Sequence, residues 1–84
     1  MASEKTIIRQ IEKTVGVNYS DWKIGITNDP AQRKAALGNL LNWLQWQADS
    51  HQEAQNVFRY FVQKGMKRSG VANKAATNVY IFLV

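Results

Sequence analysis

The sequence predicts a single α+β domain over residues 1–84, in which helices flank a three-stranded, mainly antiparallel sheet. Eighty-four residues, 45% of them hydrophobic, suffice for one small domain with one core. Helical and extended patterns alternate along the chain. No predicted strand is followed by a glycine-rich phosphate loop, which disfavours a set of parallel βαβ units. The last segment, 79–83, is β-branched and aromatic. It should lie inside the sheet, between strands at 22–26 and 42–48.

Caps and glycines divide the first part of the chain. Ser3 can cap a helix over 4–15, and Gly16 fits the position just past its end. Residues 17–21 are expected to form a loop or a short strand. Residues 22–26 alternate apolar with small or polar side chains, as a half-buried strand does. The first helix has an apolar stripe formed by Ile7, Ile8, Ile11 and Val15. We expect this stripe to pack on the sheet rather than on a second copy of the chain.

Residues 29–48 are predicted to form a short helix and a second strand. Asp29 offers a side-chain acceptor at the start of a helix over 30–37. Pro30 then occupies the first helical position, where a backbone N–H would have no hydrogen-bond partner within the helix. Gly38 ends this helix. Residues 42–48 alternate apolar side chains with glutamines, which should turn one face of a strand toward water.

A full capping box opens the third helix. Ser50 stands at the cap position and Glu53 follows three residues later, which predicts a helix over 51–64. Gly65 ends it. Residues 66–78 are basic and rich in small side chains, so we expect a loop with at most a short helical turn before the final strand.

Composition excludes several classes of protein. The absence of cysteine rules out a disulfide framework and a cysteine zinc site, and a single histidine leaves little room for a metal cluster. No apolar run approaches the ~20 residues of a membrane span. Residues 1–5 lack the apolar core of a signal peptide. We therefore expect a cytoplasmic protein without membrane association, bound metal or cofactor. The net charge of +5 would favour association with a polyanion.

The stretch from Trp22 to Arg33 joins a short strand, a capped turn and a helix that carries an arginine. Within it, Lys23-Ile24-Gly25, Thr27 and Arg33 resemble the second half of a GIY-YIG nuclease domain. In that family, a tyrosine-isoleucine-glycine tripeptide on a strand is followed by an arginine on a helix, eight residues after the glycine. Gly25 and Arg33 keep this spacing.

The likeness continues over about residues 20–84. It includes the strand around 43–48, the serine-capped helix with Glu53-Ala54 and then Tyr60-Phe61, the run Gly65-Met66-Lys67-Arg68, and the closing Val79-Tyr80-Ile81-Phe82. The resemblance implies a GIY-YIG-like fold and, in an intact member, metal-dependent cleavage of nucleic acid.

The departures from the family pattern concern the chemistry. The upstream glycine-isoleucine-tyrosine motif is missing, and Lys23 replaces the tyrosine of the second motif. The metal-binding glutamate would fall near Phe58, whose ring cannot hold a hard divalent cation. No two acids show metal-ligand spacing, and no nucleophilic triad can be assembled. Phe58 is instead expected to be buried. We predict no catalytic residues and no metal ligands.

These observations predict a non-catalytic, GIY-YIG-like domain that binds nucleic acid or a nucleic-acid-handling protein. The residues expected to contact the anionic partner are Lys23, Gly25, Thr27, Arg33, Lys34, Lys64, Lys67 and Arg68. Among them, Gly25 would let the backbone approach closely beside the strand.

Two alternatives stay open. A protein-interaction module or small inhibitor could use the first helix and exposed tryptophans. A residual metal-dependent endonuclease would need a relocated metal ligand. The partner could be DNA, RNA or a protein. Trp22, Trp43 and Tyr60 could stack on bases, although such rings more often complete the core of a small domain.

Overall fold

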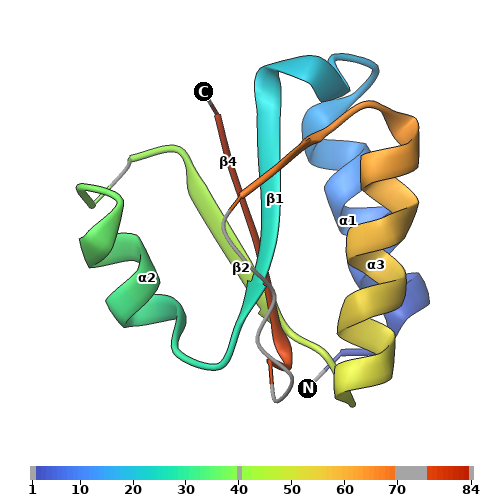
Figure 1. The fold of residues 1–84 in the computed structure, drawn as a ribbon. Helices are drawn as coiled ribbons and strands as arrows, with labels where there is room; N and C mark the ends of the chain where they lie inside the picture. Colours follow the sequence, from blue (N-terminus) through green and yellow to red (C-terminus); the bar gives the residue numbers. More distant parts are fainter. Residues whose placement is uncertain (1, 40, 70–75, 84) are drawn as a thin grey trace.

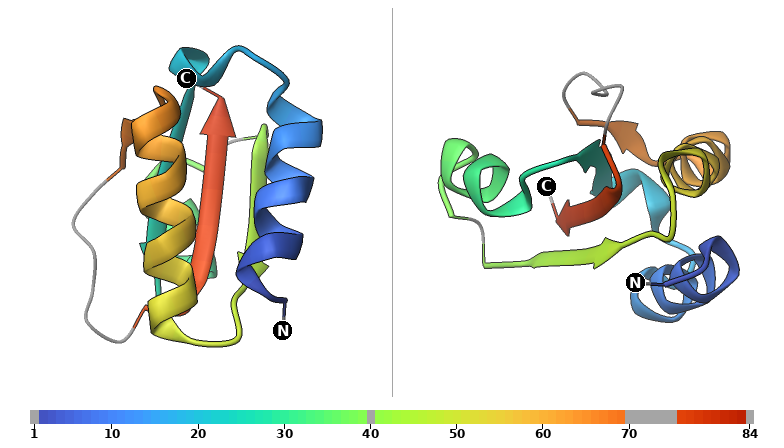
Figure 2. Two further views of the ribbon diagram at one scale, coloured as in Figure 1. Left: turned by 90° about the vertical axis from the view of Figure 1, so that its right-hand side faces the viewer. Right: turned by 90° about the horizontal axis from the view of Figure 1, so that it is seen from below.

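The computed structural model of the protein describes residues 2–39, 41–69 and 76–83. Within them, the chain forms three α-helices and a four-stranded sheet, arranged in three layers (Figure 1). Helices α1 (Glu4–Val15) and α3 (His51–Lys64) lie side by side on one face of the sheet (Figure 2), and α2 (Pro30–Ala36) lies on the other. The expected α+β class, with a sheet flanked by helices, is confirmed.

The sheet consists of β1 (Trp22–Thr27), β2 (Trp43–Gln47), β3 (Lys67–Arg68) and β4 (Asn78–Leu83). Its strand order is β2-β4-β1-β3, with β4 antiparallel to both neighbours and β3 parallel to β1. The last strand therefore lies inside the sheet, between the two strands predicted to flank it.

The predicted number of three strands is wrong, because β3 falls within the segment 66–78 that was expected to be a loop. Its two residues are both charged and pair on one side only, so they carry none of the alternation that indicates a strand. The Ser69 amide extends the pairing by donating to the Ile24 carbonyl oxygen at 2.9 Å.

The helix ends follow the local capping signals. The side chains of Ser3, Asp29 and Ser50 each accept a bond from the amide three residues later, at the starts of α1, α2 and α3. A 3₁₀ helix at Tyr19–Asp21 occupies most of the stretch expected to be a loop or short strand. Among the helices that the structure describes, none has the length and apolar character needed to cross a bilayer.

Strand register gives the sheet two unlike faces. Ile24 pairs with Ile81 and Ile26 with Val79, and these four side chains face α1 and α3. Since side chains alternate along a strand, Gly25 and its partner Tyr80 face the α2 side.

The core lies between the sheet and the two long helices. Ile7 and Ile11 of α1 and Val57 and Phe61 of α3 are completely buried against the strand residues. The apolar stripe of the first helix packs on the sheet, as predicted, so this stripe is not free to dock a partner.

Phe58 differs from its sequence-based expectation. It is half-buried and packs against the margin of the core, whereas Phe61, three residues later, is fully buried. The helical pattern included both rings in one apolar face, but the centre of that face is defined by Ala54, Val57 and Phe61.

Tyr60 joins the two long helices and should make stability depend on pH at the alkaline end. Its hydroxyl donates to Glu12 Oε2 at 3.1 Å. This hydrogen bond to Glu12, together with burial and the carboxylate charge, raises the pKa of Tyr60 above its ordinary value of 10.0. The unfolded chain therefore releases the phenolic proton first. The stability supplied by this contact is complete below the unfolded pKa and is lost as pH rises through the folded pKa.

Replacement of Tyr60 by phenylalanine should consequently lower stability at neutral pH. It should also reduce the further loss between about pH 9 and pH 11, where tyrosine titrates. Urea unfolding at both ends of this range measures the two losses. Equal alkaline losses in the Tyr60→Phe variant and the wild-type protein would show that the Glu12 contact does not control this titration.

Candidate functional site

Tyr80 lies at the centre of the sheet face that α2 partly covers. Its hydroxyl accepts a hydrogen bond from Arg33 Nε at 3.0 Å. The same hydroxyl donates to the Ser69 carbonyl oxygen at 3.2 Å and lies 3.1 Å from Ser69 Oγ. Tyr80 is 1% exposed, so a buried phenol links β4, α2 and the residue after β3.

Gly25 leaves the space that the Tyr80 ring fills. A Cβ atom at this position would collide with the Tyr80 hydroxyl oxygen and would lie 2.7 Å from the Ser69 carbonyl oxygen. Any side chain at position 25 would therefore displace the tyrosine, the backbone after β3, or both. The close approach expected beside Gly25 is made by Tyr80 of the same chain.

Aromatic rings continue this arrangement toward β2. Trp43 stacks on Tyr80 with ring centroids 4.6 Å apart and planes 9° from parallel. Phe82 stacks beside both rings, with its centroid 5.9 Å from that of Trp43. Tyr80 is thus held between Gly25 on one side and Trp43 on the other, which fixes the position of its hydroxyl and of the Arg33 group bound to it.

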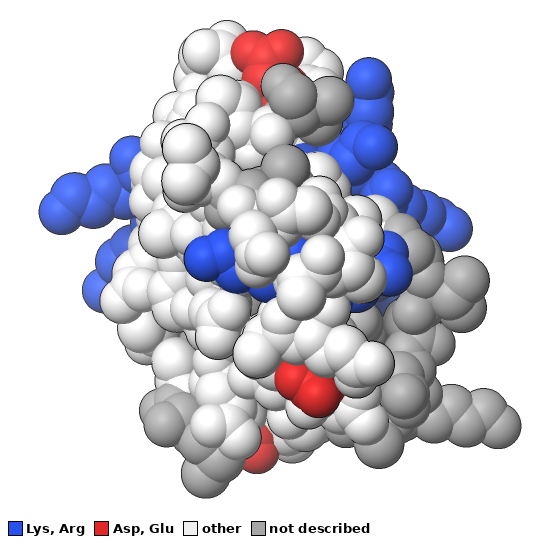
Figure 3. Space-filling view, turned by 90° about the vertical axis from the view of Figure 1, so that its left-hand side faces the viewer, with Lys and Arg blue, Asp and Glu red and all other residues white. Residues whose placement is uncertain are grey.

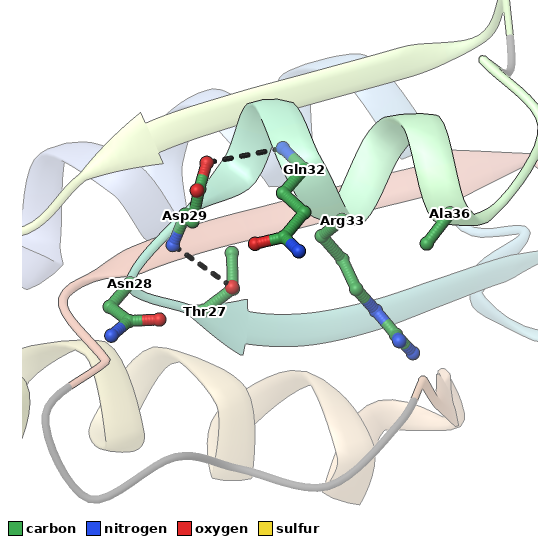
Figure 4. A pocket seen from close by; sticks show the side chains of 6 residues that line it. All are labelled: Thr27, Asn28, Asp29, Gln32, Arg33 and Ala36. Atoms are coloured by element: carbon green, nitrogen blue, oxygen red, sulfur yellow. Dashed lines mark hydrogen bonds between the residues drawn. The ribbon is translucent and has the colours of Figure 1, made fainter.

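An open pocket of about 210 Å³ lies where β1 meets α2. Figure 4 shows its lining, which comprises Thr27, Asn28, Asp29, Gln32, Arg33 and Ala36. Asp29 accepts a bond from the Gln32 amide, and Thr27 Oγ1 accepts one from the Asp29 amide, both at 3.1 Å. These two side chains therefore serve the turn itself. Arg33 extends away from them, past β1 (Figure 4).

Two lysines form a row beside this site. Lys23 of β1 and Lys67 of β3 are paired in the parallel register, so their side chains share the α2 side of the sheet. Lys34 follows Arg33 on α2 and is half-buried. Figure 3 shows this face, where Lys and Arg side chains lie at both flanks and across the middle, while Asp and Glu lie toward its top and bottom.

The structure does not bring every residue predicted for the site to this face. Lys64 Nζ lies 5.3 Å from the centroid of the Tyr60 ring, in the layer formed by the long helices. Arg68 pairs with Ile24, whose side chain faces that same layer, so Arg68 points to the opposite side of the edge strand from Lys67. The face shared with Arg33 therefore holds Lys23, Lys34 and Lys67 but neither of these two cations.

The acids and the histidine that the structure describes do not form a cluster at this face. Within residues 2–39, 41–69 and 76–83, no group of three His, Cys, Asp or Glu side chains could hold a metal ion. His51 Nδ1 donates to the Ala76 carbonyl oxygen at 2.6 Å. Phe58 belongs to α3, on the far side of the sheet from Arg33, so a side chain at that position is not part of this site.

Sequence reasoning missed Tyr80, Ser69 and the stacking role of Trp43. The final strand was correctly recognised as apolar on both faces, and this concealed the one hydroxyl in its centre. The useful signal was a tyrosine two residues from a phenylalanine on a strand expected to pair beside Gly25. A glycine in a strand interior indicates that another group approaches closely.

Comparison of the chain with protein-family models, with curated protein sequences and with solved structures gave no significant match. The function is therefore inferred from the sequence and from the geometry of the site.

Proposed function

We propose that this domain binds nucleic acid through the α2 side of its sheet and does not cut it. The observation that carries the proposal is the bond from Arg33 Nε to Tyr80, a neutral partner on a buried ring. This bond orients the guanidinium and leaves its positive charge uncompensated by that partner. The terminal nitrogens, which take no part in the bond, have the planar geometry that matches a phosphate.

The spread of the cations favours a polymer over a small anion. Lys23, Lys67 and Arg33 come from three different elements, two strands and a helix, and not from the wall of one deep pocket. The pocket beside Arg33 has a volume of about 210 Å³, below the ~300 Å³ at which pockets for drug-sized ligands begin. Successive phosphates of one strand can engage separated cations.

Binding without cleavage follows from the groups beside Arg33. Hydrolysis of a phosphodiester requires a metal or cation clamp and a base that activates water. Asp29 is the carboxylate in the pocket wall, and it already accepts the Gln32 amide. A residual nuclease would have to recruit this capping side chain, at the expense of α2.

The resemblance to GIY-YIG domains enters the proposal through the corner between β1 and α2. Gly25 and Arg33, the two residues that keep the family spacing, both contact the Tyr80 ring or its hydroxyl. We propose that this corner retains the phosphate-binding part of such a site. Phe58 lies in the other layer and has no place in it.

Fluorescence anisotropy with labelled single-stranded and duplex DNA and RNA tests the proposal. Replacement of Arg33 by alanine should weaken binding about 10–100-fold, because an oriented charge–phosphate contact is lost. For three contacts, the slope of log affinity against log salt should be about −2 for single strands and about −3 for duplexes. Replacement of Lys67 by alanine should lower this slope by somewhat less than one.

The matched control is Lys64→Ala, which removes the same charge from the other layer and should change affinity much less than Arg33→Ala. Equal losses from both variants would show that net charge, and not this face, drives binding. Absence of binding at low salt to every probe would refute the proposal. Plasmid nicking with Mg²⁺ or Mn²⁺ that disappears in Arg33→Ala would instead show a nuclease.

A further inference from the structure

One ring of the aromatic stack on the α2 side of the sheet is accessible to solvent. Tyr80 and Phe82 are 1% and 6% exposed, so these two rings complete the packing beneath this face. Trp43, which stacks on Tyr80, is only half-buried. Its indole N–H donates to Gln45 Oε1 at 2.8 Å, in an exposed position. Because this polar atom is already bonded within the chain, Trp43 offers a ligand ring surface rather than a hydrogen bond.

Strand register places the Trp43 ring in line with two cations. Trp43 of β2 pairs with Phe82 of β4, and Phe82 pairs in turn with Lys23 of β1. Lys67 of β3 follows beside Lys23. Since paired residues point to the same face, one row crosses the whole sheet from an aromatic edge to a cationic edge. Neighbouring strands lie about 4.8 Å apart, which puts the Trp43 backbone about 10 Å from that of Lys23 and about 14 Å from that of Lys67.

Arg33 belongs to the same arrangement through Tyr80. Its Nε donates to the Tyr80 hydroxyl, and Tyr80 is the ring on which Trp43 stacks. One tyrosine thus contacts both a ring that can take a base and a guanidinium that can take a phosphate. The repeating unit of a nucleic-acid strand carries one base and one phosphate, and proteins that bind single strands combine aromatic rings with cations in this way.

Of the three rings considered for stacking in the sequence, Trp43 is the one on the Arg33 face. Trp22 precedes Lys23 on β1, so its side chain points to the layer of α1 and α3, where it packs against the core. Tyr60 belongs to α3 and bonds to Glu12. Neither of these two rings can act together with Arg33.

We infer that Trp43 stacks on the face of an unpaired base, so that the nucleic acid bound at this face is single-stranded. This inference rests on the proposed binding function and specifies its substrate. In a duplex, each base is paired and stacked between its neighbours, whereas the bases of a single strand can be splayed onto an aromatic side chain. Every base has a π-face, so the contact carries little sequence preference.

Fluorescence anisotropy with three labelled probes of equal length tests the inference at about 0.15 M salt. The probes are a single strand with bases, a strand of abasic nucleotides with the same phosphates, and a duplex. Each single strand is prepared as DNA and as RNA, which separates the two sources of an unpaired base. The strand with bases should bind at least about fivefold more tightly than the abasic strand and the duplex.

Replacement of Trp43 separates stacking from phosphate contact. Trp43→Leu should weaken binding of the strand with bases about 5–100-fold more than binding of the abasic strand. Any displacement of Arg33 by this change affects both probes alike, so the difference between the two losses reports the stacked base. Trp43→Phe keeps an aromatic ring and should give a smaller difference. Circular dichroism and thermal melting establish whether each variant is folded.

A second measurement keeps the Trp43 ring in place. In a Trp22→Phe/Trp46→Phe variant, Trp43 is the remaining tryptophan, and the strand with bases should quench its emission more than the abasic strand does. The matched control is Trp22→Phe/Trp43→Phe. It leaves Trp46, which bonds to Gln10 of α1 on the other face of the sheet, and the two strands should affect its emission equally.

The outcomes distinguish the inference from the binding function on which it rests. Equal affinity for the strands with and without bases, equal losses from Trp43→Leu with both, or equal quenching of Trp43 by both would overturn the inference and leave the binding function in place. Tighter binding of the duplex would do the same. Failure of every probe to bind at low salt would refute the binding function, and the inference with it.

Discussion

Gly25→Ala is expected to destabilise the domain by about 1–3 kcal/mol, the usual cost of forcing extra atoms into a packed interior. The added methyl group would lie 2.5 Å from the ring carbon that bears the Tyr80 hydroxyl. A tyrosine on the surface could move away at little cost. Tyr80 is 1% exposed and stacks on Trp43, and the Ser69 backbone closes the remaining side.

The same substitution should also weaken nucleic-acid binding, because Arg33 would lose the hydroxyl that orients it. Urea unfolding and anisotropy titrations on one preparation measure the two effects. Tyr80→Phe is the matched variant, since it keeps the ring and removes only the hydroxyl. It should reduce affinity with a smaller cost in stability, about 1 kcal/mol.

Two outcomes would contradict this account. Wild-type stability in Gly25→Ala would mean that Tyr80 does not fill the space beside the glycine. Loss of stability with full retention of affinity would mean that the Tyr80 hydroxyl does not position Arg33 for binding.

The ends of the helices could be predicted from the sequence because their causes are local. Ser50 and Glu53 lie three residues apart, and the bond between them depends on nothing outside the first turn of α3. Asp29 and Pro30 act in the same way for α2. Gly65 then ends α3 in a conformation with φ of 120°, which favours glycine.

The candidate site could be predicted only in part because its contacts are distant in sequence. The spacing of Gly25 and Arg33 was visible along one strand and one helix. Tyr80, which connects them, follows 47 residues after Arg33. Neither periodicity nor capping reports such a contact, and strand register decides it.

The strand β3 could not be predicted from the sequence for a related reason. Lys67 and Arg68 form a strand because β1 offers an unpaired edge beside them, and their own side chains do not require it. The same register assigns Lys67 to the face of Arg33 and Arg68 to the opposite face. Charge patterning alone had grouped them, so the expected cluster of cations was broader than the surface that β1, β3 and α2 build.

Phe61→Ala is expected to cause the largest loss of stability of any single change considered, about 3–5 kcal/mol. Phe61 is completely buried, and its ring makes an edge contact with Tyr60 at 4.9 Å and a tilted contact with Tyr19 at 5.9 Å. A loss of this size is a large part of the total stability of a typical domain, about 5–15 kcal/mol. The melting temperature of the variant should therefore fall by about 12–40 °C.

Phe58→Ala is the natural comparison, because it removes the same side chain from the same helix. Phe58 is half-buried, so its truncation leaves a site that solvent can partly fill, and the loss should be about half as large or less. Urea unfolding followed by tryptophan fluorescence measures both. A greater loss from Phe58→Ala would mean that α3 is rotated about its axis relative to the sheet.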